Sequence, residues 1–227
     1  MWRALAAATV ASCALAPAAF AADSAPIQPR QAPIYVTRGV GPAMLGTVAL
    51  PIRAVRFAES WTRASQDASG LPELQRLIAP ARSMGRLQKV NYVQAAVHDR
   101  IRWMSDATQW GQHDYWASAS QTLARGAGDM EDRAIVKMQA LRALGFDPGD
   151  LFITLGRDRV GGPITVLMVR IEGRFFMVDD TGGPAVLIDR RRFEFQPQIS
   201  FGWNGAWVHA RHTPAPVTTA GASHTRR

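Results

Sequence analysis

Few side chains in this sequence can act as a nucleophile. The chain has 227 residues and one cysteine, Cys13, which lies in an apolar N-terminal run. We interpret that run below as a removable signal, so the mature chain offers no thiolate for catalysis, for a disulfide or for a metal ion. Hydroxyl nucleophiles remain, and each would need a neighbouring base. The candidates are Ser118, Ser120 and Thr122, which precede the acidic segment described next, and Thr165.

Histidines are the bases that a hydroxyl nucleophile most often uses. A histidine in a protein is nevertheless more often a surface or hydrogen-bonded residue than a catalytic one. No Gly-x-Ser-x-Gly segment is present to mark a strained nucleophile turn. His113 is the strongest candidate, because it directly precedes the segment Asp114-Tyr115-Trp116-Ala117. The full set is His98, His113, His209, His212 and His224.

Carboxylates gather in the segment Gly128-Asp129-Met130-Glu131-Asp132. Asp129 has the side chain of a helix N-cap, and Glu131 and Asp132 would lie in the first turn, where the helix dipole favours negative charge. The apolar residues that follow recur at helical spacing as far as Gly145, a typical C-terminal stop. The sequence therefore predicts a helix that begins after Asp129 and ends before Gly145.

Two further helices and a set of strands must position these residues. Apolar residues at steps of three and four predict a helix over Leu87 to Met104. Ser118-Ala119-Ser120-Gln121 has the capping-box pattern, which predicts a short helix that ends near Gly126. A shorter helix is expected between Arg53 and Arg63.

Beyond Pro148 the apolar period changes to that of strands. Glu172-Gly173 separates two strand candidates and predicts a hairpin. Helices first and strands second indicate an α+β fold, in which N-terminal helices pack on an antiparallel β-sheet. The expected strands are Leu151 to Leu155, Ile164 to Ile171, Arg174 to Asp179, Val186 to Ile188 and Phe201 to Val208.

Several of these segments occur together in an order that resembles the bacterial transglutaminase-like cysteine peptidases, a family that includes periplasmic proteases that trim large adhesins. The resemblance covers roughly residues 90–209 and implies a transglutaminase/papain-like core. Its most specific part is the segment around Met130. The matching segments are Asp114-Tyr115-Trp116-Ala117, Gly126 to Asp132, Ala134-Ile135-Val136-Lys137, Leu141 to Gly145, Val166 to Val169 and Val178-Asp179-Asp180.

The resemblance places the three positions of a catalytic triad on Met130, Ile164 and Asp179. In the family these positions hold a cysteine nucleophile, a histidine and an aspartate. A methionine thioether has no proton to lose, and an isoleucine cannot accept one, so two members of a unit are missing. We therefore expect a non-catalytic member of the family that binds a peptide or protein segment in a retained cleft. The alternative is an active hydrolase with a relocated nucleophile.

The same resemblance implies a calcium site, because family members bind calcium through acidic residues beside the nucleophile. The matching residues are Asp129 and Glu131. Carboxylate oxygens suit Ca²⁺, although two carboxylates are too few for a complete site. The alternative is that Asp129 only caps the helix while Glu131 only complements its dipole; both roles can hold together.

The N-terminus has the pattern of a secretory signal peptide. Arg3 precedes an uncharged apolar stretch that ends in Ala19-Phe20-Ala21, small residues that a signal peptidase reads. We predict a signal peptide over residues 1–21 and a periplasmic or secreted mature protein. One alternative is a buried N-terminal helix. The other is a lipoprotein site in Val10-Ala11-Ser12-Cys13, with Cys13 lipidated. No apolar run reaches the length of a membrane span.

Composition divides the rest of the chain into three parts. Residues 22–86 are predicted to be an extended lead-in with short helices, residues 87–212 to be the transglutaminase-like domain, and residues 213–227 to be a disordered tail. Tryptophans within the domain are more often core or cleft wall than a ligand box, and a groove lined by them would survive loss of the nucleophile. They are Trp103, Trp110, Trp116, Trp203 and Trp207.

The formal net charge of +8 favours anionic partners. Nucleic acid is excluded as a partner by the export signal and by the absence of any nucleic-acid-binding motif. The resemblance implies instead a peptide or protein segment, such as a surface adhesin or an active relative. A third interpretation, a basic protein that binds envelope anions, rests on charge alone.

Overall fold

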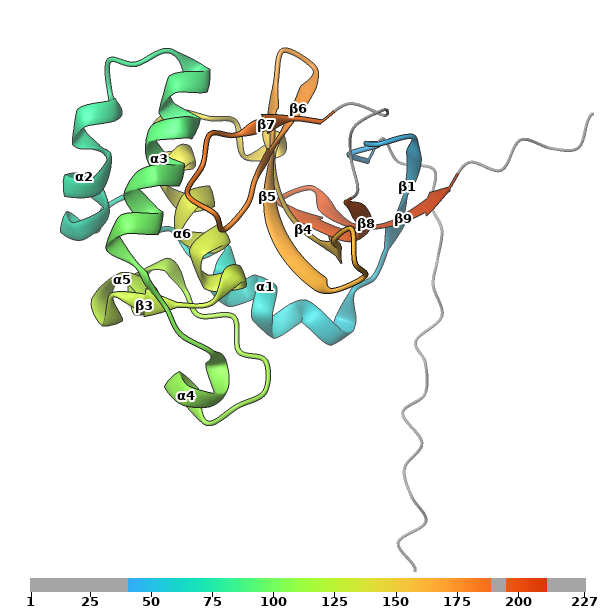
Figure 1. Ribbon diagram of the computed structural model, residues 1–227, viewed down its shortest axis with the longest axis horizontal. Coiled ribbons are helices and arrows are strands. Elements are labelled where there is room, and N and C mark those ends of the chain that lie inside the picture. Colours follow the sequence, from blue (N-terminus) through green and yellow to red (C-terminus); the bar gives the residue numbers. More distant parts are fainter. Residues whose placement is uncertain (1–40, 189–194, 212–227) are drawn as a thin grey trace, which may run out of the picture. The chain divides into compact units, whose positions relative to one another are not determined.

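The computed structural model describes residues 41–188 and 195–211 (Figure 1). All of them fall within one unit of the chain, residues 33–227. The predicted signal peptide, Cys13, most of the lead-in and the predicted tail therefore lie outside the described residues. Within the described part of the chain, no helix is long and apolar enough to cross a membrane.

Helices dominate the first half of the described chain and strands the second, as the sequence predicted. The helices are α1 (Ala58–Ala64), α2 (Pro72–Ile78), α3 (Arg86–Arg100), α4 (Asp106–Trp110), α5 (Ala119–Arg125) and α6 (Met130–Ala143), with short 3-10 turns at Val55–Phe57, Ala79–Ala81 and Pro148–Asp150. The strands are β1 (Thr47–Ile52), β2 (Arg102–Trp103), β3 (Ala127–Gly128), β4 (Leu151–Arg157), β5 (Pro163–Ile171), β6 (Arg174–Val178), β7 (Val186–Leu187), β8 (Gln196–Gly202) and β9 (Gly205–Arg211).

Seven of the strands form one antiparallel sheet in the order β1-β9-β8-β4-β5-β6-β7. β2 and β3 form a separate two-stranded parallel ladder. Figure 1 shows α2, α3 and α6 on one side of the sheet. This arrangement confirms the predicted α+β fold with helices packed on an antiparallel sheet.

Helix α6 is buried on almost every side, since each residue from Asp132 to Leu141 is buried. Its apolar residues pack against α3 on one side and against β4 and β5 on the other. Lys137 and Gln139 are also buried in this helix, and each donates a hydrogen bond to a backbone oxygen of another segment. The first residues of α6 are thereby held on a rigid base.

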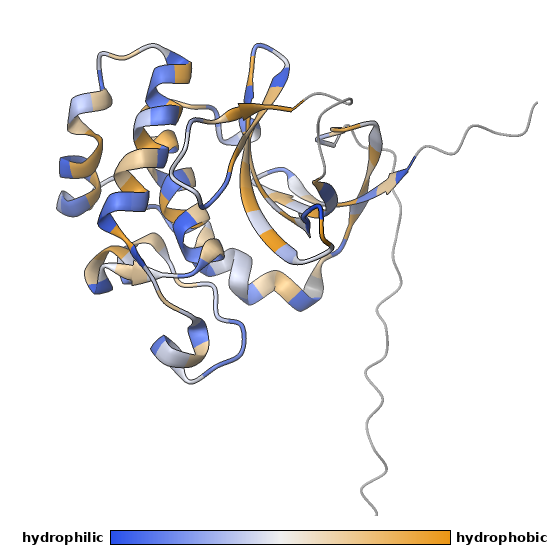
Figure 2. Cartoon of the chain, viewed as in Figure 1, coloured by the Kyte–Doolittle hydropathy of each residue, from blue (hydrophilic) through white to orange (hydrophobic). Residues whose placement is uncertain are grey.

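Alternation along β5 divides the apolar residues into two clusters. Leu167 and Val169 belong to the cluster between the sheet and the helices. Val166 and Met168 belong to a second cluster on the opposite face of the sheet. Figure 2 shows the strands of the sheet coloured largely as hydrophobic, as expected for a sheet that is covered on both faces.

Three local predictions are confirmed in detail. Ser118 caps α5 in a capping box with Gln121. Asp129 caps α6, and its side chain accepts hydrogen bonds from the backbone N–H groups of Glu131 and Asp132. The β5–β6 hairpin turns at Glu172 and Gly173, with φ angles of 50° and 75°. Two successive positive φ angles are those of a type I′ turn.

Three other elements differ from the prediction. The helix expected to continue to Met104 ends at Arg100, because the following residues leave it to pair with β3. The single strand expected over Phe201 to Val208 is a hairpin of β8 and β9, and Gly205 at its turn has a φ of 137°. The lead-in contains strand β1, which pairs with β9. Each difference depends on pairing with residues far away in the sequence.

Candidate functional site

The N-terminus of α6 brings the acidic segment to one place. The carboxylate of Asp129 accepts hydrogen bonds from the backbone nitrogens of Glu131 and Asp132, at 3.1 and 3.3 Å. Met130 is the first residue of the helix. The backbone of Gly128 lies close to the side chain of Asp132: a Cβ placed on Gly128 would be 2.6 Å from the Cβ of Asp132. A side chain at Gly128 would therefore push the first turn of α6 out of place.

Three carboxylates converge at this helix end. One oxygen from each of Asp106, Asp129 and Asp132 lies within 4.8 Å of the others. Asp106 comes from the first turn of α4, where it accepts a hydrogen bond of 2.5 Å from the backbone nitrogen of Tyr115. Asp132 accepts one of 2.7 Å from the backbone nitrogen of Ala117. The segment between α4 and α5 is thus tied to the first turn of α6.

Burial and mutual repulsion act strongly on these acids. Burial, followed by the charges of Glu131, Asp132 and Asp106, raises the pKa of Asp129 to about 9. Burial raises the pKa of Asp132 to about 7. The pKa values of Asp106 and Glu131 are also raised, mainly by burial. Without a cation, the group therefore binds protons at neutral pH.

The residues present fit a metal ion. Asp106 and Asp132 are at most 4% exposed. The second oxygen of each, Oδ1 of Asp106 and Oδ2 of Asp132, is buried and has no hydrogen-bond partner among the described residues. An unpaired buried carboxylate oxygen costs free energy that a bound cation would recover. Oxygen-only ligands of this kind suit a hard cation.

Sequence reasoning named only one of these three carboxylates as a ligand. Asp129 was singled out, whereas Asp106 and Asp132 were not. Glu131, the other predicted ligand, accepts a hydrogen bond of 2.6 Å from the Thr165 hydroxyl on β5 and is not a member of the three-carboxylate group. The signal for Asp132 was its helical position three residues after Asp129. No signal in the sequence connected Asp106 with either.

The position matched to the family's histidine lies at the start of β5. Ile164 packs against the second cluster, on the face of the sheet away from α6. Its neighbour Thr165 is 3% exposed and reaches Glu131 on α6. Met130 belongs to neither apolar cluster of the described residues. The residue of β5 whose side chain reaches the first turn of α6 is therefore Thr165.

The position matched to the family's aspartate is held by polar contacts from three elements. The Oδ1 atom of Asp179 accepts hydrogen bonds from Gln94 Nε2 at 3.0 Å and from Thr181 Oγ1 at 2.7 Å. Lys137 on α6 donates to the backbone oxygen of Asp179 at 2.5 Å. Burial lowers the pKa of Lys137 to about 8. Gln94 and Thr181 thus satisfy a carboxylate oxygen that would otherwise be free to orient a histidine.

The adjoining residue, Asp180, forms a partly buried ion pair. Arg133 on α6 donates from Nη1 to both carboxylate oxygens of Asp180, at 2.8 and 2.9 Å. Arg133 also donates to the backbone oxygen of Ile101. His98 on α3 lies 3.2 Å from the backbone oxygen of Asp180 through its Nδ1 atom. These contacts tie the end of β6 to both α3 and α6.

One hydroxyl–histidine pair was missed by sequence reasoning. Ser200 Oγ lies 2.8 Å from Nε2 of His209, and Nδ1 of His209 lies 2.9 Å from Thr47 Oγ1. Thr47 donates its only proton to the backbone oxygen of Met44, so it accepts from Nδ1 of His209. Nε2 then accepts from Ser200, which in turn accepts from Thr154 at 2.8 Å.

In this chain of hydrogen bonds Ser200 donates to His209, as a serine nucleophile donates to its base. A substrate, however, has no access to Ser200. Ser200 and Thr154 have no exposed surface. Burial lowers the pKa of His209 to about 4. A substrate carbonyl cannot reach Ser200 without opening the sheet, so the contacts of Ser200 and His209 hold strands β1, β9, β8 and β4 together.

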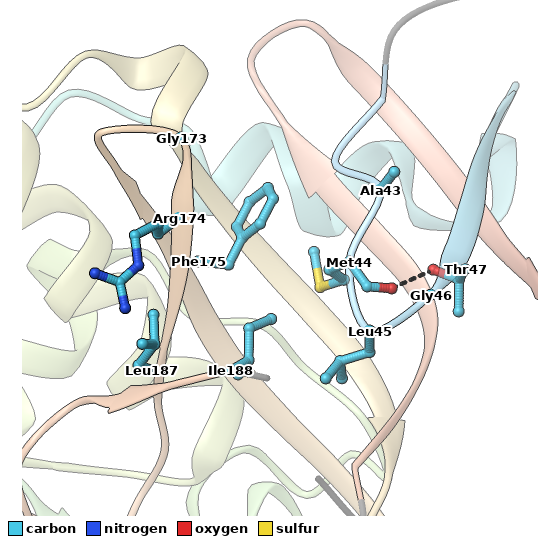
Figure 3. Close-up of a pocket in the computed structure, with 10 residues that line it drawn as sticks. All are labelled: Ala43, Met44, Leu45, Gly46, Thr47, Gly173, Arg174, Phe175, Leu187 and Ile188. Atoms are coloured by element: carbon cyan, nitrogen blue, oxygen red, sulfur yellow. Dashed lines mark hydrogen bonds between the residues drawn. The ribbon is translucent and has the colours of Figure 1, made fainter. Parts of the chain in front are cut away.

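A cavity of about 450 Å³ lies on the second face of the sheet. Figure 3 shows Phe175 and Ile188 facing Met44 and Leu45 across it, while the guanidinium of Arg174 points away. Leu45 has a φ of 51°, a conformation that leucine seldom adopts. The cavity contains no residue of the α6 site, so it is separate from the carboxylate group.

Comparisons with known proteins agree with the fold. The family model described as bacterial transglutaminase-like cysteine proteinase matches residues 46–214, more than half of the chain. The structure of LapG from Legionella pneumophila is 21% identical, with a TM-score of 0.52, over 70% of this chain and 89% of that one. Calcium-bound LapG has a TM-score of 0.53 and is matched over 91% of its chain. No match was found among curated proteins.

Proposed function

Because the chain belongs to the family of bacterial transglutaminase-like cysteine proteinases, we propose that it is a non-catalytic member that binds a polypeptide segment near the N-terminus of α6. One observation carries the proposal. Met130 occupies the first residue of α6, where the family resemblance puts the cysteine, and the only cysteine of the chain is Cys13. A thioether cannot form the acyl intermediate of a cysteine peptidase.

Peptidase assays of the purified mature protein test this proposal. We expect no turnover of a panel of unfolded and folded protein substrates, and we expect at least one of them to be retained in a pull-down. Turnover that persists through further purification, and that disappears on substitution of one hydroxyl residue, would show an altered enzyme instead.

A second candidate function follows from one specific contact. Of the four hydroxyls considered as nucleophiles, Thr165 is the one that donates to a carboxylate, at 2.6 Å from Glu131 Oε1. The others bond to one another or within their own helix turn: Ser118 to Ser120, and Thr122 to the backbone of Ser118. Burial raises the pKa of Glu131, as a general base near neutral pH requires.

The low exposure of Thr165, at 3%, makes hydrolysis the lesser candidate. The test is turnover by wild type compared with Thr165→Val and Glu131→Gln. Activity that both substitutions remove would support a Thr165–Glu131 pair. Activity that neither removes would leave this candidate without support.

We also propose that Asp106, Asp129 and Asp132 hold a calcium ion, with the negative charge of Glu131 close to Asp129. The support is the convergence of three carboxylates, two of them with an unpartnered buried oxygen, together with the calcium-bound structure of LapG. A bound ion would supply the positive charge that these residues lack and would fix the segment between α4 and α5 against α6. Calcium should raise the melting temperature, since it binds the folded chain alone.

The raised pKa values give this calcium effect a pH dependence with a definite sign. The folded values for Asp129 and Asp132, about 9 and about 7, lie above those of an unfolded aspartate. In the calcium-free protein, stability is therefore lost as pH rises from about 4 to about 9. Calcium competes with the protons, so its stabilising increment should grow over the same range.

Scanning calorimetry at about pH 5.5 and pH 8, with and without millimolar calcium, measures that increment. Asp132→Asn should reduce it, whereas Asp158→Asn should not, because Asp158 bonds within the β4–β5 turn and is not one of the three carboxylates. An increment that is absent at both pH values would leave Asp129 with its capping role alone.

Export to the periplasm is the remaining part of the proposal. Its support is the sequence pattern of residues 1–21 together with the family to which the chain belongs. The partner is then a polypeptide of that compartment, such as a surface adhesin or an active relative. The intact mass of the exported protein should correspond to a start at Ala22, and a lipidated form that starts at Cys13 would contradict this processing.

A further inference from the structure

The ladder of β2 and β3 exposes a tryptophan beside the candidate site. Trp103 is 56% exposed, although its side chain is one of the largest in the chain. It pairs in register with Gly128, which stands two residues before Met130. The backbone of Trp103 therefore lies beside the segment that leads into α6, and Gly128 opposite it has no side chain.

The outer edge of β2 has no strand partner among the described residues. The inner edge pairs with β3: the backbone nitrogens of Arg102 and Met104 donate to the backbone oxygens of Gly126 and Gly128, at 2.9 and 3.1 Å. In a parallel ladder, alternate residues direct their backbone groups to the same side. The N–H and C=O of Trp103 therefore point away from β3, toward solvent, and offer one donor and one acceptor to an extended chain.

Two exposed arginines flank this edge. Arg102 is exposed and adjoins Trp103, and Arg125 is exposed and comes two residues before Ala127, the partner of Arg102. The Arg125 guanidinium is held 3.9 Å above the ring of Trp110, so its position is defined. Within the described parts of the chain, neither arginine forms an ion pair. Both remain available to carboxylates of a partner.

We propose that the edge formed by Arg102, Trp103 and Arg125 binds an acidic polypeptide segment in an extended conformation. The backbone of the segment pairs with Trp103, an apolar side chain lies on the indole, and flanking carboxylates contact the two arginines. This inference rests on the proposed polypeptide-binding function and adds to it the charge, conformation and docking edge of the partner.

Fluorescence anisotropy with a labelled peptide, Glu-Val-Glu-Leu-Glu-Val, tests the inference on the mature protein. The matched peptide with lysine in place of glutamate should bind at least tenfold more weakly. A form of the acidic peptide that is N-methylated at alternate residues should also bind weakly, because it lacks the donors for edge pairing. Binding of the acidic peptide should weaken as salt is raised, since surface charges are screened.

Substitutions assign the binding to this edge. Trp103→Ala and Arg102→Glu should each weaken binding of the acidic peptide about tenfold, the loss expected when a central interface tryptophan or arginine is removed. Both residues are exposed, so circular dichroism should show an unchanged fold. Matched controls in the β4–β5 hairpin, Val160→Ala in its turn and Arg157→Glu at the end of β4, should bind as wild type does.

Two outcomes would overturn the inference while sparing the proposed function. One is retention of a panel protein by wild type and by Trp103→Ala alike. The other is equal affinity for the acidic and basic peptides. Failure of every polypeptide to bind would remove the proposed binding function as well.

Discussion

At the scale of single residues, Met130 decides the chemistry that is open to this chain. Its position at the start of α6 would favour a thiolate, because helix N-termini stabilise negative charge. The same position is crowded by carboxylates whose pKa values are already raised. For a thiol placed there without an imidazole, the helix N-terminus would lower the pKa and the carboxylates would raise it. The reactivity of the thiol reports which effect is larger.

Met130→Cys makes that comparison measurable. We expect the new thiol to react slowly with iodoacetamide near pH 7 and to show an inflection in its pH–rate profile above about 8.5, the value for an unperturbed thiol. Wild type, which has no cysteine after Cys13, is the unlabelled control. An inflection below pH 7 would mean that the helix terminus outweighs the neighbouring carboxylates.

A second substitution tests which residue of β5 faces that thiol. In the Met130→Cys background, Thr165→His should accelerate alkylation at neutral pH, because Thr165 already reaches the first turn of α6. Ile164→His, the change suggested by the family resemblance, should have less effect, because Ile164 packs on the opposite face of the sheet. The reverse order would show that the start of β5 turns toward α6.

His209 is the other single residue with a measurable signature. Its pKa of about 4 lies below that of an unfolded histidine, so it contributes stability above about pH 6.5 that is lost as pH falls toward 4. Because the ring is partly exposed, we expect a loss of only about 1–2 kcal/mol, less than the full shift would give.

Urea unfolding of wild type and His209→Gln isolates this contribution. The difference in unfolding free energy between them should be largest near pH 7 and should shrink by about 1–2 kcal/mol at pH 4.5. His98→Gln serves as the control histidine. A difference that does not change with pH would mean that His209 is as easily protonated in the folded chain as in the unfolded one.

At the scale of elements, side-chain caps mark where α5 and α6 begin. The Ser118 hydroxyl accepts from the backbone nitrogen of Gln121, and the Gln121 side chain accepts from the backbone nitrogen of Ser118. Ser105 stands at the same position before α4, yet its side chain makes no capping bond and contacts the Thr108 hydroxyl instead. The two serines form a natural pair for comparison.

Ser118→Ala should lower the unfolding free energy by about 1 kcal/mol, the usual cost of losing a cap. Ser105→Ala should cost clearly less, because no backbone donor loses its partner. Denaturant titrations of both variants provide the measurement. Equal losses of unfolding free energy in the two variants would show that the capping box of Ser118 and Gln121 contributes no stability of its own.

At the scale of the whole molecule, aromatic packing joins the helical half to the sheet. Phe201 on β8 is 2% exposed, and its ring centroid lies 5.0 Å from that of Phe57, 5.4 Å from that of Trp116 and 6.2 Å from that of Trp61. These partners come from the turn before α1, from the segment before α5 and from α1 itself. One side chain thus holds several separate segments together.

Phe201→Ala should therefore destabilise the protein by about 3–5 kcal/mol, the range for deletion of a buried aromatic ring. Phe201→Leu should cost less, and Val160→Ala, at an 82% exposed position, should cost almost nothing. Far-UV and near-UV circular dichroism should report one coincident transition in each case. Separate transitions would mean that the helices and the sheet unfold independently.

The amino-acid sequence by itself determined what depends on near neighbours. The caps at Ser118 and Asp129, the turn at Glu172-Gly173 and the alternation of β5 each involve residues a few positions apart, and the structure confirms them. The order of helices and strands likewise followed from local periodicity, and with it the α+β fold. The absence of a second cysteine needed no structure at all.

Tertiary structure alone decided which distant residues meet. Asp106 joins Asp129 and Asp132 because the segment between α4 and α5 folds back on α6, and no pattern in the sequence links positions 23 residues or more apart. The pairing of Ser200 with His209, the strand β1 and the early end of α3 also depend on partners from other elements. Local side-chain patterns specify backbone conformation, whereas the chemistry of a site depends on how whole elements pack, which is set by the burial of all their apolar faces together.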